Sequence, residues 1–413
     1  MRSYFAALTI VAAALAIAIT VSSSKAETYR VAPAPGAAAA LINSGKIVGG
    51  DVILLQDGDH GGLDIHPNAR FDLRVTIKAE HPHKAHVDFI YLRDTSQNIT
   101  VAGLNVWPAD PHVHGGQHIA TWGGSAHITL SNLDIRGGQD AASYAVWSAA
   151  EWIARKATGI ELGGSFNTVQ NSRLTGVGFG IQLLGPNGRA IRNTISGFAA
   201  DGLRGGSDHQ VFRDNLVQNC FSVDENHADG LQIYGGGRVV TGTLIERNRI
   251  IEWNIGPNAL RCGMQGIVAF DDFQEGLTIR NNIVSVRNGH GIAVNGAHNA
   301  KIVSNTVVQA DGLPGQWPWI ALYNSNKGQQ SSGVVIANNI SMAPPPAADS
   351  ANGIVVIGNG IITDPATAFT DLVTFTPTTA SGFIGTADPA YKVSLDAFRR
   401  TRAAPDKGAV EAQ

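Results

Sequence analysis

Residues 223–234 read VDENHADGLQIY and place three acids and a histidine within a short, polar stretch. Carboxylates and imidazoles are the groups that most often move protons in enzymes, and carboxylates also bind calcium. Asp224, His227 and Asp229 are therefore candidate catalytic residues. The same stretch also fits an ordinary solvated turn, because Asp before Gly is a common turn pair.

A second chemical pattern involves the residue that comes immediately before a recurring glycine. Asp201, Asp229 and His290 each hold this position. If the glycines occupy equivalent places in stacked strands, which lie about 4.8 Å apart, the two acids are neighbours. Two neighbouring carboxyl groups titrate as a coupled pair, and one of them has a raised pKa, as acid–base catalysis requires.

The glycines belong to a repeat in the middle of the chain, and consecutive copies begin 21 to 36 residues apart. Each copy has Gly, then Ile or Leu in a short alternating strand, then a turn and two further strands. Period-two alternation with many β-branched residues predicts strands, and a fixed repeat predicts that they stack in register. The copies start at Gly159, Gly180, Gly202, Gly230, Gly266 and Gly291.

We therefore predict an all-β fold, a single-stranded right-handed parallel β-helix (solenoid) that spans residues 27–413. Only residues 142–155 have a pattern that fits a short helix. A recurrent asparagine supports the fold, because stacked amides can bond to the coils above and below and Asn tolerates a left-handed corner. The expected ladder consists of Asn171, Asn193, Asn215, Asn248, Asn282, Asn305 and Asn339.

Two long copies carry their extra residues just before the next glycine, in 219–229 and 250–265. Insertions at one corner of consecutive coils should stack into a wall, and a groove beside a wall suits a linear polymer. Loop insertions are also tolerated without a function, because they destabilise little. Cys220 and Cys262 lie in these insertions, where they either form a disulfide or remain separate buried thiols.

The second residue after each glycine should point outward and form a floor beside this wall. The floor is polar from Glu161 to Gln232 and becomes apolar at Val268. An arginine guanidinium can donate two hydrogen bonds to one carboxylate. A tyrosine ring can stack on a sugar ring or pack against neighbouring side chains. The candidate substrate-binding residues are Arg204, Gln232, Tyr234, Arg261, Asp271 and Asp272.

The segment 49–65, GGDVILLQDGDHGGLDI, resembles the first coil of secreted pectate-lyase-like, chondroitinase-like and alginate-active β-helix proteins. The last residues, APDKGAVE from Ala404, resemble the closing segment of many bacterial β-helix proteins. Because these two segments lie near the two ends of the chain, the resemblance extends over most of its length. They imply a fold that hosts many different chemistries.

The Gly-His-Gly triplet 289–291 and the Asp-Gly pair 229–230 are similar to the motifs of polygalacturonase-type glycoside hydrolases. That resemblance implies that Asp201 and Asp229 act across a glycosidic bond, with His290 in support. The chain departs from this pattern because its Asp-Asp pair, 271–272, follows the first strand of its coil instead of preceding it. The Arg-x-Lys motif of that family is not evident either.

A second resemblance, to alginate-type lyases and uronan C5-epimerases, rests on the order of Asp224, His227, Asp229 and His290, with one extra residue between the first two. It implies removal of the proton next to a uronate carboxylate, which needs a base and a group that neutralises the carboxylate. His227 or Tyr234 would be the base. Arg204 and Arg261 would hold the carboxylate.

The signal for metal binding in the sequence is weak, and no cofactor is certain. Calcium is a candidate, because carboxylate oxygens suit this ion, although no regular loop spacing is present. Three histidines could suggest zinc, but no fourth ligand is evident near them. The calcium candidates are Asp224, Glu225 and Asp229, and the zinc candidates are His112, His114 and His118.

The first residues predict export. A basic start precedes an alanine-rich apolar run over 6–21, and small residues at 24–26 suit cleavage, so 1–26 is the predicted signal peptide. A signal-anchor helix is the alternative. We expect a secreted or periplasmic mature protein without a membrane attachment. The net charge of −3, with 15% charged residues, argues against a nucleic-acid partner.

The leading hypothesis is an exported enzyme that cleaves a polysaccharide, one that contains uronate, by β-elimination. The alternatives are a polygalacturonase-like glycoside hydrolase, a uronan C5-epimerase, and a non-catalytic carbohydrate-binding or surface β-helix. In each case the partner is a polysaccharide or oligosaccharide. The sugar, the linkage, the mode of attack and the oligomeric state are left open.

Overall fold

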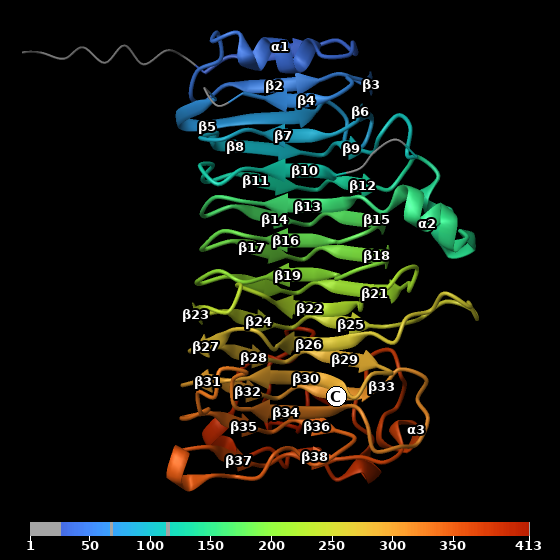
Figure 1. The fold of residues 1–413 in the computed structure, drawn as a ribbon, viewed down its shortest axis with the longest axis vertical. Helices are drawn as coiled ribbons and strands as arrows, with labels where there is room; N and C mark the ends of the chain where they lie inside the picture. The colour runs from blue at the N-terminus through green and yellow to red at the C-terminus, as the bar shows by residue number, and fades with distance from the viewer. Residues whose placement is uncertain (1–25, 67–68, 113–115, 413) are drawn as a thin grey trace, which may run out of the picture.

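The computed structural model describes residues 26–66, 69–112 and 116–412. Short parallel strands form coils that stack along one axis, and the regular coils contribute one strand to each of three long sheets (Figure 1). Neighbouring strands in each sheet come from consecutive coils, as the register of β13, β16 and β19 illustrates. The predicted all-β parallel solenoid is confirmed.

The ten-stranded sheet holds the first strand of each repeat and all the predicted floor residues. Its strands are β4 (Leu63–Ile65), β7 (Ile90–Leu92), β10 (Gln117–Thr121), β13 (Thr158–Leu162), β16 (Ile181–Leu183), β19 (Leu203–Gly205), β22 (Asp229–Ile233), β26 (Gln265–Ala269), β30 (His290–Asn295) and β34 (Trp319–Tyr323).

The thirteen-stranded sheet holds the second strand of each repeat. Its strands are β1 (Thr28–Val31), β2 (Val52–Leu55), β5 (Arg70–Ala79), β8 (Gln97–Ala102), β11 (Thr129–Ser131), β14 (Thr168–Gln170), β17 (Arg189–Ile191), β20 (Val211–Arg213), β24 (Leu244–Glu246), β28 (Thr278–Arg280), β32 (Lys301–Val303), β35 (Val335–Ala337) and β37 (Val355–Ile357).

The twelve-stranded sheet holds the third strand of each repeat. Its strands are β3 (Gly58–Asp59), β6 (Ala85–Val87), β9 (Asn105–Val106), β12 (Asp134–Arg136), β15 (Arg173–Val177), β18 (Thr194–Phe198), β21 (Leu216–Cys220), β25 (Arg249–Ile251), β29 (Ile283–Val286), β33 (Thr306–Gln309), β36 (Ile340–Ser341) and β38 (Gly360–Ile361).

A small three-stranded sheet and a few short helices complete the described structure. The small sheet consists of β23 (Val239–Thr241), β27 (Phe273–Glu275) and β31 (Ala297–His298). The helices are α1 (Ala37–Asn43), α2 (Ala149–Arg155) and α3 (Pro365–Ala368), with short 3₁₀ helices at Ala141–Val146, Ser350–Asn352, Thr379–Ser381 and Pro389–Tyr391. The helix expected over 142–155 is therefore present, divided into a 3₁₀ turn and α2.

The core lies inside the stack, where alternate residues of all three sheets meet. Ile181, Leu203 and Leu231, on consecutive coils, are fully buried one above another. Helix α1 covers the first coil (Figure 1), and its buried residues Ala38 and Ile42 join the same core. Burial of such a continuous apolar column supplies most of the favourable free energy of a solenoid.

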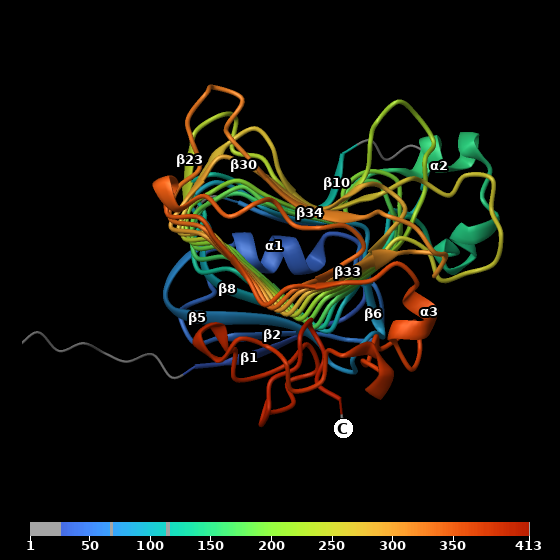
Figure 2. The same cartoon turned by 90° about the horizontal axis from the view of Figure 1, so that it is seen from below.

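The C-terminal segment packs along the outside of the stack. In Figure 2 it lies against the faces opposite the ten-stranded sheet. Ala409 and Val410 pack against Val308 and Ile340 on the outward side of the twelve-stranded sheet, and the backbone N–H of Ala409 donates to Thr306 Oγ1 at 2.9 Å. The closing segment expected from Ala404 onward thus lies beside the coils.

The asparagine ladder is present, with two corrections. The side-chain amide of Asn248 donates to Asn282 Oδ1 at 3.0 Å, and its own Oδ1 accepts from the amide of Asn215 at 2.9 Å. This arrangement repeats without interruption from Asn193 to Asn359, a residue that the sequence analysis missed. Asn171 was assigned wrongly, because Ser172 holds the ladder position in that coil.

The left-handed corner residue was also assigned wrongly. It is the residue before each ladder asparagine that has a positive φ, for example 54° at Arg247 and 55° at Asn281. The ladder side chains point inward and are buried, whereas the preceding residue makes the turn. Asn171 is one of these turn residues, with a φ of 53°.

The predicted signal peptide cannot be compared with the structure, because residues 1–25 lie outside the described part. Within the described residues, no helix is long and apolar enough to cross a membrane.

We expect Asn248→Ala to destabilise the fold by about 2–4 kcal/mol, because it leaves buried amide and backbone groups without partners. Urea denaturation would measure the loss. The matched control is Asn171→Gly, which should change the stability by less than about 0.5 kcal/mol, since glycine suits a positive φ. Equal effects of the two substitutions would contradict the assigned roles.

Candidate active site

The candidate site lies where the twelve-stranded sheet turns into the ten-stranded sheet. The N–H groups of Gly180 and Ile181 both donate to the next coil, to the carbonyls of Asp201 and Gly202 at 2.9 and 3.1 Å. Successive N–H groups of a regular strand point to opposite sides, so the alternation breaks at the glycine, as in a β-bulge. The residue before the glycine is therefore outside the regular alternation, and its side chain lies at the corner and not in the apolar core.

The glycine itself is required by the interior of the corner. A Cβ atom at Gly230 would lie 2.2 Å from Ile250 Cγ2, which points into the core. Only glycine lets the chain pass this close to the third strand. This close approach fixes the direction of the preceding side chain in coil after coil.

Asp201 and Asp229 lie side by side at this corner and form what we call the acid pair. The backbone N–H of Asp229 donates to Asp201 Oδ1 at 3.2 Å. The two residues are only 4% and 0% exposed. Neither carboxylate oxygen of Asp229 has a hydrogen-bond donor among the described residues.

Burial changes the protonation of both acids. It raises the pKa of Asp201 to about 6, although the nearby Arg204 opposes the shift. Burial raises the pKa of Asp229 to about 8, and the charge of Asp201 contributes to that rise. At neutral pH the acid pair therefore holds one proton, mainly on Asp229.

Arg204 projects from the floor beside the acid pair. Its Nε lies 3.9 Å from Asp201 Oδ2, and its guanidinium carbon lies 4.7 Å from the centre of the Tyr234 ring. Phe179, which precedes Gly180 and was missed as a site residue, lies on the same guanidinium, with 5.6 Å between the guanidinium carbon and the centre of its ring.

The predicted order of the floor residues along the ten-stranded sheet is confirmed. The strand register pairs Glu161, Gln182, Arg204, Gln232, Val268 and Ala293 in consecutive coils.

His227 reaches the acid pair from the loop before β22. Its Nδ1 lies 3.6 Å from Asp229 Oδ2, and its side chain is 67% exposed. An exposed imidazole thus stands over a buried carboxyl group. Asp224 in the same loop instead forms an ion pair with Lys156 and accepts the N–H of Asn226 at 3.1 Å, so it stabilises the loop.

Two predicted substrate-binding residues have structural partners instead. Asp272 is buried, and its carboxylate accepts the N–H groups of Gly237 and Arg238 at 2.8 and 3.2 Å, which closes a loop. Arg261 pairs with Glu252 at 2.9 Å and Asp311 at 2.6 Å. Both side chains therefore already have structural partners, and their contact with a substrate stays a prediction.

Gln232, Tyr234 and Asp271 lie on or beside the floor of the ten-stranded sheet, where a substrate was expected to bind. Gln232 is the floor residue directly next to Arg204, and Tyr234 is exposed beside it. Asp271 is exposed, and its charge contributes to the raised pKa of Asp229. These three remain candidates for contact with a substrate.

His290 holds the same corner position two coils beyond Asp229, but its surroundings differ. Its ring lies 5.2 Å from that of Phe270 and 5.5 Å from that of Trp319. Burial lowers the pKa of His290, so the imidazole is neutral near pH 7. The site thus changes from polar to aromatic along the sheet.

Loops rise on both sides of the ten-stranded sheet (Figure 2). One wall contains the two predicted insertions, joined by the Cys220–Cys262 disulfide. It packs around an aromatic cluster in which Phe221 lies 4.6 Å from Trp152 and 5.1 Å from Trp253. The other wall, built on β23, β27 and β31, was not predicted because its strands have only two or three residues.

The metal candidates from the sequence do not converge among the described residues. Asp224, Glu225 and Asp229 do not bring their carboxylate oxygens together there. His112 pairs with Glu151 at 3.0 Å, His118 is buried in β10, and His114 lies outside the described residues. In the described part, the side chains that do converge are Asp59, His86 and Asp88.

Residues 90–364 match the family model described as the right-handed beta helix region. Because the match covers more than half of the sequence, the chain belongs to the right-handed β-helix family. No curated protein matches the sequence.

Solved structures are similar to this chain at the level of the fold, and two of them illustrate this. A mannuronic-acid-specific polysaccharide family 6 lyase from human gut microbiota is 17% identical, with 80% of this chain and 82% of that chain covered and a TM-score of 0.50. The A-module of the mannuronan C-5 epimerase AlgE6 from Azotobacter vinelandii is 14% identical, with 79% and 85% covered and a TM-score of 0.50.

We expect Asp229→Asn to stabilise the protein increasingly as the pH rises from about 4 to about 8, and by a constant amount above that. Burial raises the pKa of Asp229 to about 8 in the folded state, so its contribution to folding is fully present below the unfolded-state pKa of about 4 and is lost progressively until the pH passes about 8. The amide does not ionise and avoids the loss. Melting temperatures should diverge by roughly 2–4 °C for each kcal/mol.

Asp72→Asn, at an exposed residue of β5, serves as the control for this measurement, because Asp72 does not contribute to the raised pKa of Asp229. Its melting temperature relative to the wild type should stay nearly constant over the same pH range. A flat difference for Asp229→Asn as well would show that Asp229 is already ionised in the folded protein.

Proposed function

We propose that this protein is a polysaccharide lyase that acts on a uronate-containing polymer by β-elimination. The observation that carries the proposal is the meeting of Arg204, the exposed His227 and the proton-holding acid pair at one point of the ten-stranded sheet. The likeness to lyase and epimerase folds supports action on a polysaccharide, and the sugar is proposed from the site chemistry.

Arg204 is the group suited to hold the uronate carboxylate. A guanidinium can donate two parallel hydrogen bonds to a carboxylate. If both carboxyl groups of the acid pair were ionised, their two negative charges would repel the substrate carboxylate and attract the Arg204 guanidinium. Because the pair retains a proton, it carries one charge fewer, and Arg204 remains available to the substrate.

His227 is the proposed base. Its Nδ1 faces Asp229, so its Nε2 is directed away from the acid pair, and the side chain is exposed enough to reach a bound polymer. His227 takes the C5 proton, a C4–C5 double bond forms, and the C4–O4 bond breaks. Tyr234, which lies beside Arg204, is placed to give a proton to the departing O4 oxygen.

A glycoside hydrolase is the second candidate, because Asp229 remains protonated at neutral pH as a general acid must. A hydrolase needs both carboxyl groups in contact with the glycosidic bond or its water. The burial of Asp201 and Asp229 argues against that contact. A C5-epimerase would share the first step and return the proton on the opposite face.

Incubation with a panel of uronans distinguishes these activities. A lyase produces unsaturated ends that absorb in the ultraviolet, whereas a hydrolase produces reducing ends without that absorbance. An epimerase changes the uronate composition without cleavage. A protein that binds a uronan and changes none of these would contradict the proposal of an enzyme.

We expect Arg204→Ala and His227→Ala to lower kcat/KM for the cleaved uronan by about 10²–10³-fold each. Arg192→Ala, at the ladder corner, and His66→Ala, after β4, are the matched controls and should retain near wild-type values. Circular dichroism would verify the fold of each variant. Full activity of both site variants would refute the assigned roles.

We also propose that residues 1–26 are a signal peptide and that the mature protein is secreted or periplasmic. The basic start and the apolar run of 6–21 support this. Intact mass measurement of the exported protein should show a chain that begins at Glu27. An unprocessed chain in the membrane fraction would favour the signal-anchor alternative.

A further inference from the structure

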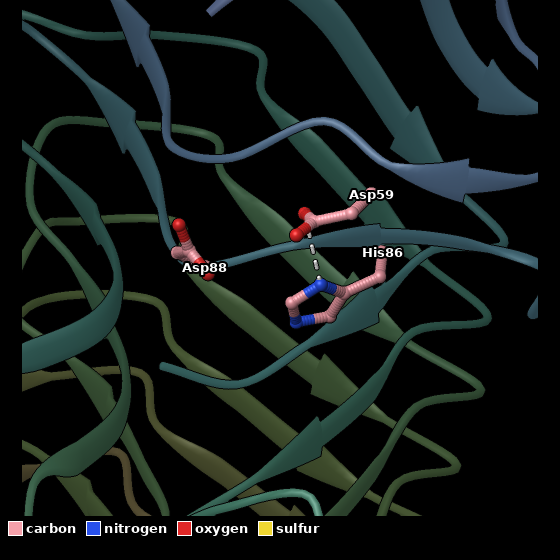
Figure 3. A group of neighbouring side chains, drawn as sticks. All are labelled: Asp59, His86 and Asp88. Atoms are coloured by element: carbon pink, nitrogen blue, oxygen red, sulfur yellow. Dashed lines mark hydrogen bonds and ion pairs between the residues drawn. The ribbon is translucent and has the colours of Figure 1, made fainter. Parts of the chain in front are cut away.

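We propose that Asp59, His86 and Asp88 form a binding site for one divalent transition metal ion, such as Zn²⁺. The ion would link β3 and β6, the first two strands of the twelve-stranded sheet. Each side chain offers a ligand atom, and these atoms lie within 4.8 Å of one another. Figure 3 shows His86 facing Asp59, with Asp88 alongside. The site is independent of the proposed polysaccharide chemistry.

The hydrogen bonds of His86 prepare its ring for a cation. Its Nε2 lies 2.9 Å from the backbone carbonyl of Trp107, which can only accept, so Nε2 carries the hydrogen. In the neutral ring this leaves a lone pair on Nδ1. Metal-binding histidines are commonly oriented by such a bond from the other ring nitrogen to a carbonyl.

The lone pair of Nδ1 faces a second acceptor. Asp59 Oδ1 lies 3.2 Å from Nδ1, and two acceptors at this distance need a cation between them. Ligands about 2.1 Å from a tetrahedral zinc ion are about 3.4 Å apart, which is close to this separation. A proton on Nδ1 would also satisfy these two groups, and the zinc titration described below distinguishes a bound metal ion from a proton.

The ring is also held in place from the side. The indole of Trp107 stacks on His86 with 4.5 Å between the ring centres, and the His86 side chain is only 16% exposed. Asp59 is 62% exposed, so an ion can enter from solvent. A hollow lined by Asp59, His86, Trp107 and Gln139 opens beside the group.

The donor set indicates the class of metal. One imidazole nitrogen and two carboxylates suit zinc and related transition ions, whereas calcium prefers oxygen ligands only. Water molecules would complete the coordination, because three protein ligands leave a position open.

The position of the group indicates a structural role. Asp59 belongs to β3, and His86 belongs to β6 in the next coil, and these two strands pair over only two residues. A metal ion shared between them would strengthen a short contact near the start of the stack. Asp88 precedes β7, which is five strands from β22 in the ten-stranded sheet, roughly 24 Å from the acid pair.

The test is calorimetric titration of the chelator-treated protein with Zn²⁺ alone. We expect one zinc ion per chain and a higher melting temperature in its presence, since a ligand that binds the folded state stabilises it. Asp59→Asn and His86→Gln should each weaken zinc binding by at least about 100-fold. Because the Asp59 side chain is exposed, Asp59→Asn should fold as the wild type does, which circular dichroism would verify.

The chain offers a matched control in a second histidine–aspartate pair. His81 Nδ1 lies 3.0 Å from Asp57 Oδ1, without a third converging carboxylate among the described residues. His81→Gln should therefore leave zinc binding unchanged, as should Arg204→Ala in the proposed active site. Uronan cleavage should be retained in Asp59→Asn.

Several outcomes would overturn the proposal. They are the absence of zinc binding, zinc binding that survives Asp59→Asn, as a site at His112 and His118 would produce, and equal loss in His81→Gln. Displacement of zinc by an equal concentration of Ca²⁺ would refute the assigned class of metal.

Discussion

The in-register stacking of parallel strands, about 4.8 Å apart, is the constraint on which every other feature of this protein depends. It brings each residue next to its counterpart in the coils above and below, whatever their chemical types. Where the counterparts are apolar, as at Ile181, Leu203 and Leu231, they build the core. Where they are polar, the result depends on whether they can donate and accept hydrogen bonds to one another.

The asparagine ladder and the acid pair are opposite outcomes of the same stacking. An amide has both donors and an acceptor, so Asn215, Asn248 and Asn282 bond to each other in a buried row. A carboxylate only accepts, so Asp201 and Asp229 cannot satisfy each other unless a proton is retained. The raised pKa values follow from burial, and for Asp229 also from the charge of Asp201.

The same reasoning connects the acid pair to its surroundings. Arg204 and His227 supply the positive charge and the titratable ring that the pair lacks, from the floor and from the loop before β22. Tertiary packing holds that loop, because the disulfide and the aromatic cluster around Trp152 fix the wall from which it emerges. Farther along the sheet, where no acid occupies the corner, His290 lies among aromatic rings and remains neutral.

The sequence by itself determined the repeat, the strands and the residues that share a column, because each of these follows from glycine spacing and period-two alternation along one chain. The order of the floor and the proximity of Asp201 to Asp229 were therefore predictable. Only the tertiary structure decided which polar side chains already had partners. Asp272 is bound by backbone N–H groups, Asp224 by Lys156 and Arg261 by Glu252. The group of Asp59, His86 and Asp88 likewise arises from the meeting of two coils. Unlike the asparagine ladder, contacts between different residue types in neighbouring coils do not recur along the sequence, so they could not be inferred from it.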